Sequence, residues 1–181
     1  MFVTICISTT KIQKISEITN FFEHFLIPNS GHYYNNRFWP EKFETCGDEA
    51  VLRWLESHVC MIPMEPRRPG CSVVEGKDIT EAKVKNLAKA ADDCWQAILA
   101  KDFEAFASGF KASFDAQVAM FPAMVQGCVQ SFIDKYSALP EVHAWKMPGA
   151  GGGGYLVLVV DDVKAFAEKH PEAIALTIRR K

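Results

Sequence analysis

The stretch KMPGAGGGG, residues 146–154, leads directly into the apolar run YLVLVV, residues 155–160. Five of the chain's 11 glycines fall within six positions here. Each glycine in ordered backbone costs about 0.5–1 kcal/mol relative to alanine. Such a cluster is expected where the backbone needs positive φ, or where a ligand or another segment must approach without a Cβ in the way. A flexible hairpin connection is the alternative, but flexible linkers are also rich in Ser and Thr. We therefore predict an ordered loop between two core strands.

This stretch resembles the third motif of the GHMP kinases, the family of galactokinase, homoserine kinase, mevalonate kinase and phosphomevalonate kinase. The shared pattern is a lysine (Lys146), an apolar residue, one further residue, and Gly-Ala-Gly-Gly-Gly-Gly before an aromatic residue and a β-rich run. The resemblance extends from Phe38 to Arg180. Outside the loop it rests on the order of a strand, three helices and then the loop. It is closest to the bacterial sugar or heptose kinases and covers only the C-terminal half of such an enzyme.

The resemblance implies an α+β fold of two layers, with an antiparallel, ferredoxin-like sheet and helices packed on one face. It divides the chain into an aromatic-rich N-terminal segment, residues 1–40, and a GHMP kinase C-terminal-like domain, residues 41–181. In the family this loop lies in a cleft between two domains, beside the phosphate-binding loop and the substrate. ATP and Mg²⁺ are cofactors that the resemblance alone implies. The implied substrate is a sugar or another small molecule.

The chain also departs from the family pattern. Pro148 stands where the family has Ser or Thr before Gly-Ala-Gly, which removes a hydroxyl and a backbone donor. The Gly- and Ser-rich nucleotide loop, the N-terminal substrate motif, the metal-binding side chains and the catalytic base are missing. The unrelated GxxxxGK[ST] loop is absent too. We therefore expect a truncated kinase domain that is inactive alone. One half of a split kinase, completed by a separate N-terminal half, and a non-enzymatic binding or dimerisation module are the alternatives.

The predicted phosphate or substrate site combines the loop with two basic side chains. A glycine-rich turn presents successive backbone N–H groups to an anion, and phosphoryl transfer depends mainly on positioning and charge stabilisation. Lys146 either stabilises charge there or is a solvated strand lysine. Arg67, in a Pro-rich loop after the first matched strand, either donates as a planar fork or is solvated. No catalytic residue or metal ligand is predicted. The predicted binding residues are Gly149, Ala150, Gly151, Gly152, Gly153, Gly154, Lys146 and Arg67.

Hydrophobic periodicity and capping residues predict the surrounding elements. Asp78 and Glu81 suggest a capping box before one helix, and Asp102 and either Asp161 or Asp162 suggest caps for two others. Pro122 is expected to open a further helix. The predicted helices span residues 48–56, 84–99, 103–114, 122–136 and 163–167. The predicted strands span residues 58–64, 142–146, 156–160 and 173–178.

Composition favours one compact domain, because 49% of the 181 residues are hydrophobic and 23% are charged. The net charge of −2, without a Lys/Arg cluster, argues against nucleic acid or an anionic membrane as a partner. The chain shows no signal peptide and no membrane span, so we expect it to be cytoplasmic. Six cysteines without CxxC spacing are expected to be reduced, and five scattered histidines predict no local zinc site.

The N-terminal segment is unusually aromatic. Residues 21–43 contain eight aromatic side chains, and the apolar residues of 12–26 could form one helix face. Three interpretations stay open: an extension of the core, a cover for a surface that once met another domain, or a self-association surface that makes a homodimer.

Overall fold

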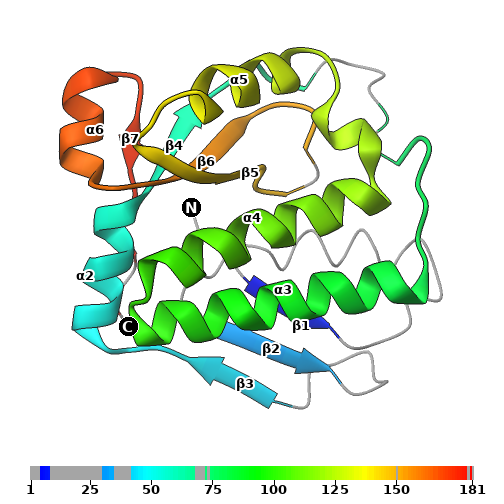
Figure 1. Cartoon of the computed structure of the whole chain (residues 1–181), viewed down its shortest axis with the longest axis horizontal. Coiled ribbons are helices and arrows are strands. Elements are labelled where there is room, and N and C mark those ends of the chain that lie inside the picture. The colour runs from blue at the N-terminus through cyan, green and yellow to red at the C-terminus, as the bar shows by residue number, and fades with distance from the viewer. Residues whose placement is uncertain are drawn as a thin grey trace.

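The computed structural model describes residues 5–8, 30–34, 42–67, 72, 74–149, 151–178 and 180. Figure 1 shows the helical pair α3 and α4 across the middle of the molecule, with strands on either side of it. The elements are β1 (Ile5–Ser8), β2 (Ser30–Tyr34), β3 (Lys42–Thr45), α2 (Glu49–His58), β4 (Val59–Pro63), α3 (Glu81–Ala100), α4 (Phe103–Met120), the 3₁₀ turn η1 (Pro122–Val125), α5 (Cys128–Ser137), β5 (Val142–Lys146), β6 (Tyr155–Val160), α6 (Val163–Lys169) and β7 (Ile174–Ala175).

The larger described sheet is antiparallel, in the order β5-β6-β4-β7. Its central strands β4 and β6 are apolar along their whole length, as expected for strands covered on both faces. Alternate residues enter two clusters: Met61 packs with α2, α3 and α4, whereas Ile62 packs with α5 and α6. The predicted α+β fold, with an antiparallel sheet and a helical layer on it, is confirmed. The second face of this sheet carries helices as well.

The second described sheet has the order β1-β2-β3, with β1 parallel to β2 and β2 antiparallel to β3. Strand β1 packs against α3, on the lower side of the helical pair in Figure 1. The predicted division at residues 40 and 41 stays a prediction, and β2 and β3 pair across it. The helix face expected within residues 12–26 lies outside the described residues.

The helices α3 and α4 pack closely because Gly109 presents no side chain to its neighbour. A Cβ at Gly109 would lie 2.8 Å from the Cα atom of Cys94 on α3. The turn between the helices places Lys101 in the left-handed region, with φ of 56°. The close approach of α3 and α4 at Gly109 forms a helical layer, and β5 packs against α4 in this layer.

Most predicted caps are confirmed. Asp102 Oδ1 and Asp162 Oδ1 each accept a hydrogen bond from a backbone N–H group in the first turn of their helices, as predicted, and Asp48, which was not predicted as a cap, does the same for α2. The predicted capping box of Asp78 and Glu81 is wrong. Thr80 caps α3 instead, through its Oγ1, and Asp78 pairs with the amine of Lys83 at 2.6 Å.

Several predicted elements have different bounds, and for two of them the structure gives the physical reason. The helix expected from Pro122 onward is interrupted after η1, because Gly127 adopts a φ of 61° that no helix interior can hold. The last strand is only two residues long, since the chain pairs with β4 at Ala175 and Ile174 and then leaves the sheet.

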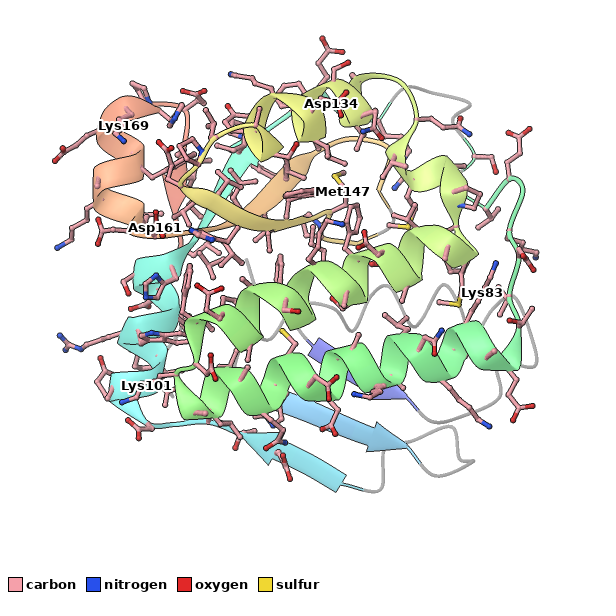
Figure 2. The ribbon with its side chains drawn as sticks, in the orientation of Figure 1. Lys83, Lys101, Asp134, Met147, Asp161 and Lys169 are labelled. Carbon is pink, nitrogen blue, oxygen red and sulfur yellow. The ribbon has the colours of Figure 1, made fainter. Side chains whose placement is uncertain are left out.

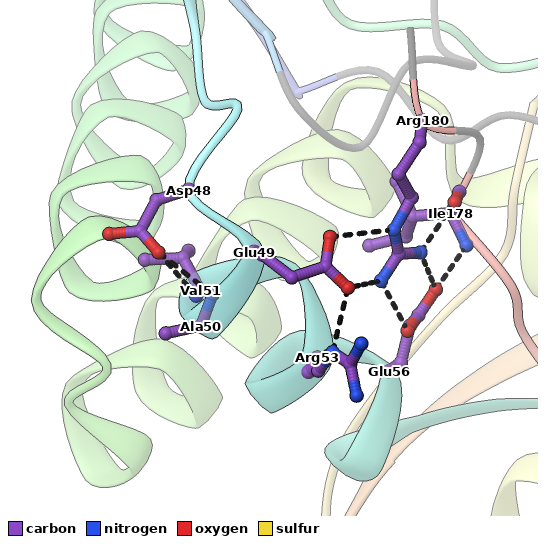
Figure 3. A network of polar contacts seen from close by, with 8 residues as sticks. All are labelled: Asp48, Glu49, Ala50, Val51, Arg53, Glu56, Ile178 and Arg180. Atoms are coloured by element: carbon purple, nitrogen blue, oxygen red, sulfur yellow. Dashed lines mark hydrogen bonds and ion pairs between the residues drawn. The ribbon is translucent and has the colours of Figure 1, made fainter.

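The C-terminal part of the described chain is fastened to α2 by charged groups (Figure 3). Arg180 donates from Nε and Nη2 to the two carboxylate oxygens of Glu49, at 3.0 and 2.9 Å. It also donates from Nη1 and Nη2 to Glu56. The N–H of Ile178 donates to Glu56 Oε1 at 2.5 Å. These contacts join Ile178 and Arg180 to α2.

None of the helices within the described ranges is both long and apolar enough to cross a membrane. The described cysteines, Cys46, Cys60, Cys94 and Cys128, are free thiols, and all but Cys128 are buried. Burial raises the pKa of the Cys60 and Cys94 thiols to about 12, so both are neutral. They act as small apolar side chains of the core.

Candidate anion site at the glycine loop

The glycine loop joins β5 to β6 and uses backbone conformations that favour glycine. The φ angles of Gly149, Gly151 and Gly152 are 80°, 79° and 76°, and those of Gly153 and Gly154 are 148° and 98°. Side-chain-bearing residues rarely adopt such positive values. The predicted site residue Ala150 lies outside the described residues. Positive φ therefore accounts for the five glycines.

The loop is held by backbone contacts on two sides. The N–H of Gly152 donates to the Met124 carbonyl in η1, and the N–H of Gly154 donates to the Glu65 carbonyl, both at 3.0 Å. A Cβ at Gly151 would lie 2.8 Å from Met124 Cβ, and one at Gly153 would lie 2.6 Å from the Glu65 carbonyl oxygen. These contacts favour the ordered loop over the flexible connection.

The Arg67 side chain contacts this loop. Its Nε donates to the carbonyl oxygen of Gly151 at 3.1 Å, although 84 residues separate the two in sequence. Arg67 is exposed, and its guanidinium carries four more N–H donors beyond Nε. The structure therefore brings Arg67 together with the glycine loop, as the predicted site requires.

The backbone donors are fewer than the sequence suggests. Gly152 and Gly154 already give their N–H groups to protein carbonyls, so neither is a donor for a bound anion in this conformation. Within the described ranges, the N–H groups of Gly149, Gly151 and Gly153 have no protein acceptor. The candidate donor set therefore consists of these three N–H groups and the Arg67 guanidinium.

Lys146 is buried, whereas one of its two predicted alternatives was a solvated strand lysine. Only 7% of the residue is exposed, so the solvated interpretation is wrong. Its Nζ donates to Ser113 Oγ on α4 at 3.0 Å. Burial lowers the pKa of its amine to about 8. The amine thus lies between β5 and α4, whereas the loop that follows it in sequence contacts Arg67.

The residues to which sequence reasoning gave no role in this site lie at the start of the loop, in η1 and on α4. Met147, labelled in Figure 2, is fully buried and begins the loop. Met124 accepts the Gly152 hydrogen bond. On α4, Ser113 and Gln117 are buried polar residues four positions apart, and this spacing on an otherwise apolar helix face was the available signal. By contrast, the other labelled side chains in Figure 2, all charged, lie around the outside of the molecule.

The donor chemistry suits a phosphate group better than a metal ion. Arginine and backbone N–H groups are hydrogen-bond donors that match phosphate oxygens. In the described part of the chain, no three His, Cys, Asp or Glu side chains gather closely enough to hold a metal ion. The described residues of this site therefore do not fit Mg²⁺, and phosphate is the ligand that their donors suit.

Comparisons with known proteins add little to this geometry. No family model and no curated protein matches the chain. A solved structure from Campylobacter jejuni, named "Putative Sugar Kinase", aligns with a TM-score of 0.49 and 14% sequence identity. The alignment covers 82% of this chain and 42% of that chain, so the chain spans less than half the length of that protein.

Proposed function

We propose that residues 41–181 act as the C-terminal domain of a GHMP-type small-molecule kinase, in which the glycine loop and Arg67 bind a phosphate group. The observation that carries this proposal is the hydrogen bond from Arg67 Nε to the Gly151 carbonyl. It fixes a guanidinium beside a loop whose resemblance to a kinase motif does not involve Arg67. The motif and the cation thus come together from distant parts of the sequence.

The chemistry of the pair suits phosphoryl transfer. The carbonyl of Gly151 orients the guanidinium through Nε, and the remaining N–H donors face an anion as a planar fork. The N–H groups of Gly149, Gly151 and Gly153 add backbone donors without adding an acid or a base. Such a site stabilises the negative charge of a transferred phosphoryl group by position alone.

The proposal assigns ATP and Mg²⁺ to a nucleotide-binding half that a complete kinase of this type would supply. This chain would contribute one wall of the cleft and would not transfer phosphate alone. The acceptor would be a hydroxyl of a sugar or another small molecule. A cytoplasmic location, where ATP is abundant, would suit this role.

Equilibrium binding of inorganic phosphate to the full chain tests the proposal. Arg67→Ala is expected to weaken phosphate binding at least about tenfold, the equivalent of about 1.4 kcal/mol. Arg67→Lys should recover only part of the affinity, because an ammonium group lacks the planar fork. Arg53→Ala is the matched control: Arg53 is an exposed arginine on α2 that pairs with Glu49 at 2.7 Å, and its loss should leave phosphate affinity unchanged. Equal affinity in wild type and Arg67→Ala would refute the assigned site.

A further inference from the structure

Gln117 is a buried polar side chain for which the fold provides no partner. It lies on α4, its exposed fraction is 0%, and neither Oε1 nor Nε2 has a hydrogen-bond partner among the described residues. Buried side-chain polar atoms in native proteins nearly always have a partner, which can be a bound water or ligand. An amide with both its donor and its acceptor unused is therefore a candidate for binding a further polar group.

Gln117 shares its face of α4 with one other buried polar side chain. Ser113 lies one helical turn earlier on the same face of α4 and is 4% exposed. Its Oγ donates to the Phe110 carbonyl at 2.8 Å and accepts from Lys146 Nζ at 3.0 Å. A buried lysine, serine and glutamine thus occur together on the layer where α4 packs against β5.

This layer is connected to the glycine loop through a series of backbone hydrogen bonds. The Gln117 carbonyl accepts from the N–H of Phe121, the Phe121 carbonyl accepts from the N–H of Met124, and the Met124 carbonyl accepts from Gly152. In addition, Lys146 immediately precedes the loop residue Met147. The polar layer therefore supports the inner side of the loop.

The hydrogen-bonding capacity of the two unpaired amide atoms defines the chemistry of a group that could bind them. Gln117 Nε2 needs an acceptor, and Oε1 needs a donor. An ionised carboxylate would satisfy only Nε2, and an ammonium group would satisfy only Oε1. A hydroxyl group satisfies both, because it donates and accepts at once.

We infer that Gln117, beside Ser113 and Lys146, forms an internal site for a hydroxyl group that accepts from Nε2 and donates to Oε1. The hydroxyl belongs either to a resident water molecule or to a hydroxyl-bearing small molecule such as a sugar or polyol. This site is separate from the phosphate site at Arg67. Neither inference depends on the other.

Nuclear magnetic resonance of the ¹⁵N-labelled full chain distinguishes the two sources. A resident water would give cross-peaks between the Gln117 side-chain amide protons and a long-lived water signal. A polyol would shift the same amide resonances during titration with glycerol, D-glucose or myo-inositol. Either result supports the site. An amide that shows neither the water contact nor a shift with any of these probes overturns it.

Replacing Gln117 gives a second test of the site, which needs no added small molecule. Gln117→Met keeps the size and removes the amide, so loss of a bound hydroxyl should lower the melting temperature by about 3 °C or more. The matched control is Gln96→Met on the exposed side of α3, which should change the melting temperature by less than about 1 °C. If Gln117→Met instead raises the melting temperature, the amide has no partner in the native protein, and the inference is wrong.

Discussion

Arg67 Nε donates to the carbonyl oxygen of Gly151 at 3.1 Å, which links the end of β4 to the loop between β5 and β6. The same two segments are joined by the hydrogen bonds of Gly154 with Met64 and Glu65. The Arg67 side chain is thus carried on backbone that is itself fixed to the loop. A guanidinium and a glycine loop in this relationship would form the preorganised anion site that we propose.

Substitution of the loop glycines tests whether the loop is ordered as described. Gly151→Ala and Gly153→Ala should each lower the free energy of unfolding by about 2–5 kcal/mol. Positive φ costs roughly 1–2 kcal/mol for a residue with a side chain, and the close backbone contacts add about 1–3 kcal/mol. Urea-induced unfolding measures the difference.

Two other glycines serve as controls. Gly149→Ala should cost only about 1–2 kcal/mol, because its φ is 80° but no atom lies within 4 Å of the added Cβ. Gly47→Ala should be close to neutral, since its surroundings are open and its φ is not positive. If Gly151→Ala behaves like Gly47→Ala, the loop is not held against η1.

Gly109 should show an effect opposite to ordinary helix propensity. In a helix interior, replacing glycine by alanine normally stabilises a protein by about 1 kcal/mol. At Gly109 the new Cβ would lie 2.8 Å from Cys94 Cα and 2.9 Å from its N, which are backbone atoms. Gly109→Ala should therefore destabilise the chain by about 1–3 kcal/mol in urea unfolding. The exposed neighbour Ser108→Ala should give a small gain, and a gain at Gly109 would show that α3 and α4 are not in backbone contact.

The charged contacts of Arg180 should make the stability of the fold sensitive to acid. Hydrogen bonds from Arg180 lower the pKa of Glu49 to about 2 and also lower the pKa of Glu56. A carboxylate whose folded pKa is lowered stabilises the fold above its unfolded pKa, near 4.5, and loses that contribution as the pH falls toward 2. Arg180→Met should thus be less stable than wild type at pH 6, with the gap closing between pH 4.5 and 2.

Circular dichroism during acid unfolding measures this gap. Arg53→Met is the control, because it removes only one contact of Glu49 and none of Glu56. A constant difference between Arg180→Met and wild type from pH 6 to pH 2 would contradict the ionic origin of the effect.

The buried amine of Lys146 should make the free energy of unfolding depend on pH in the alkaline range. Burial lowers the pKa of its amine to about 8, so between pH 8 and about 10.5 the unfolded chain binds more protons than the folded one. Its contribution should therefore make the fold more stable as the pH rises through this range. Lys146→Met should be more stable than wild type at pH 7 by about 1–3 kcal/mol, and the advantage should shrink by pH 10. Lys89→Met, at an exposed position on α3, should show no such pH dependence in the same urea titrations.

The strands and the loop could be predicted because their signals are local. An apolar run such as residues 155–160, bounded by turn residues, is typical of a buried strand, and a glycine cluster before it is typical of backbone with positive φ. Asp102 and Asp162 could be predicted as caps because a capping carboxylate reaches its own helix within three residues.

The remaining features depend on contacts between distant segments. Thr80 caps α3 in place of Asp78 because the helix begins at Glu81, and Asp78 instead pairs with Lys83. Burial of Lys146 results from the packing of β5 against α4, which strand periodicity cannot distinguish from a solvent-facing position. The isolated amide of Gln117 follows from the same packing. The pairing of Arg67 with Gly151 also depends on the register of β4 and β6, although both residues were predicted for one site.

The most direct test of the phosphate site is a titration of the ¹⁵N-glycine-labelled full chain with inorganic phosphate at constant ionic strength. Binding at Arg67 and the loop should shift the amide resonances of Gly149, Gly151 and Gly153, while those of Gly47 and Gly76 stay unchanged, and Arg67→Ala should abolish the shifts. If the loop glycines do not respond, or respond equally in Arg67→Ala, the glycine loop and Arg67 do not form a phosphate site.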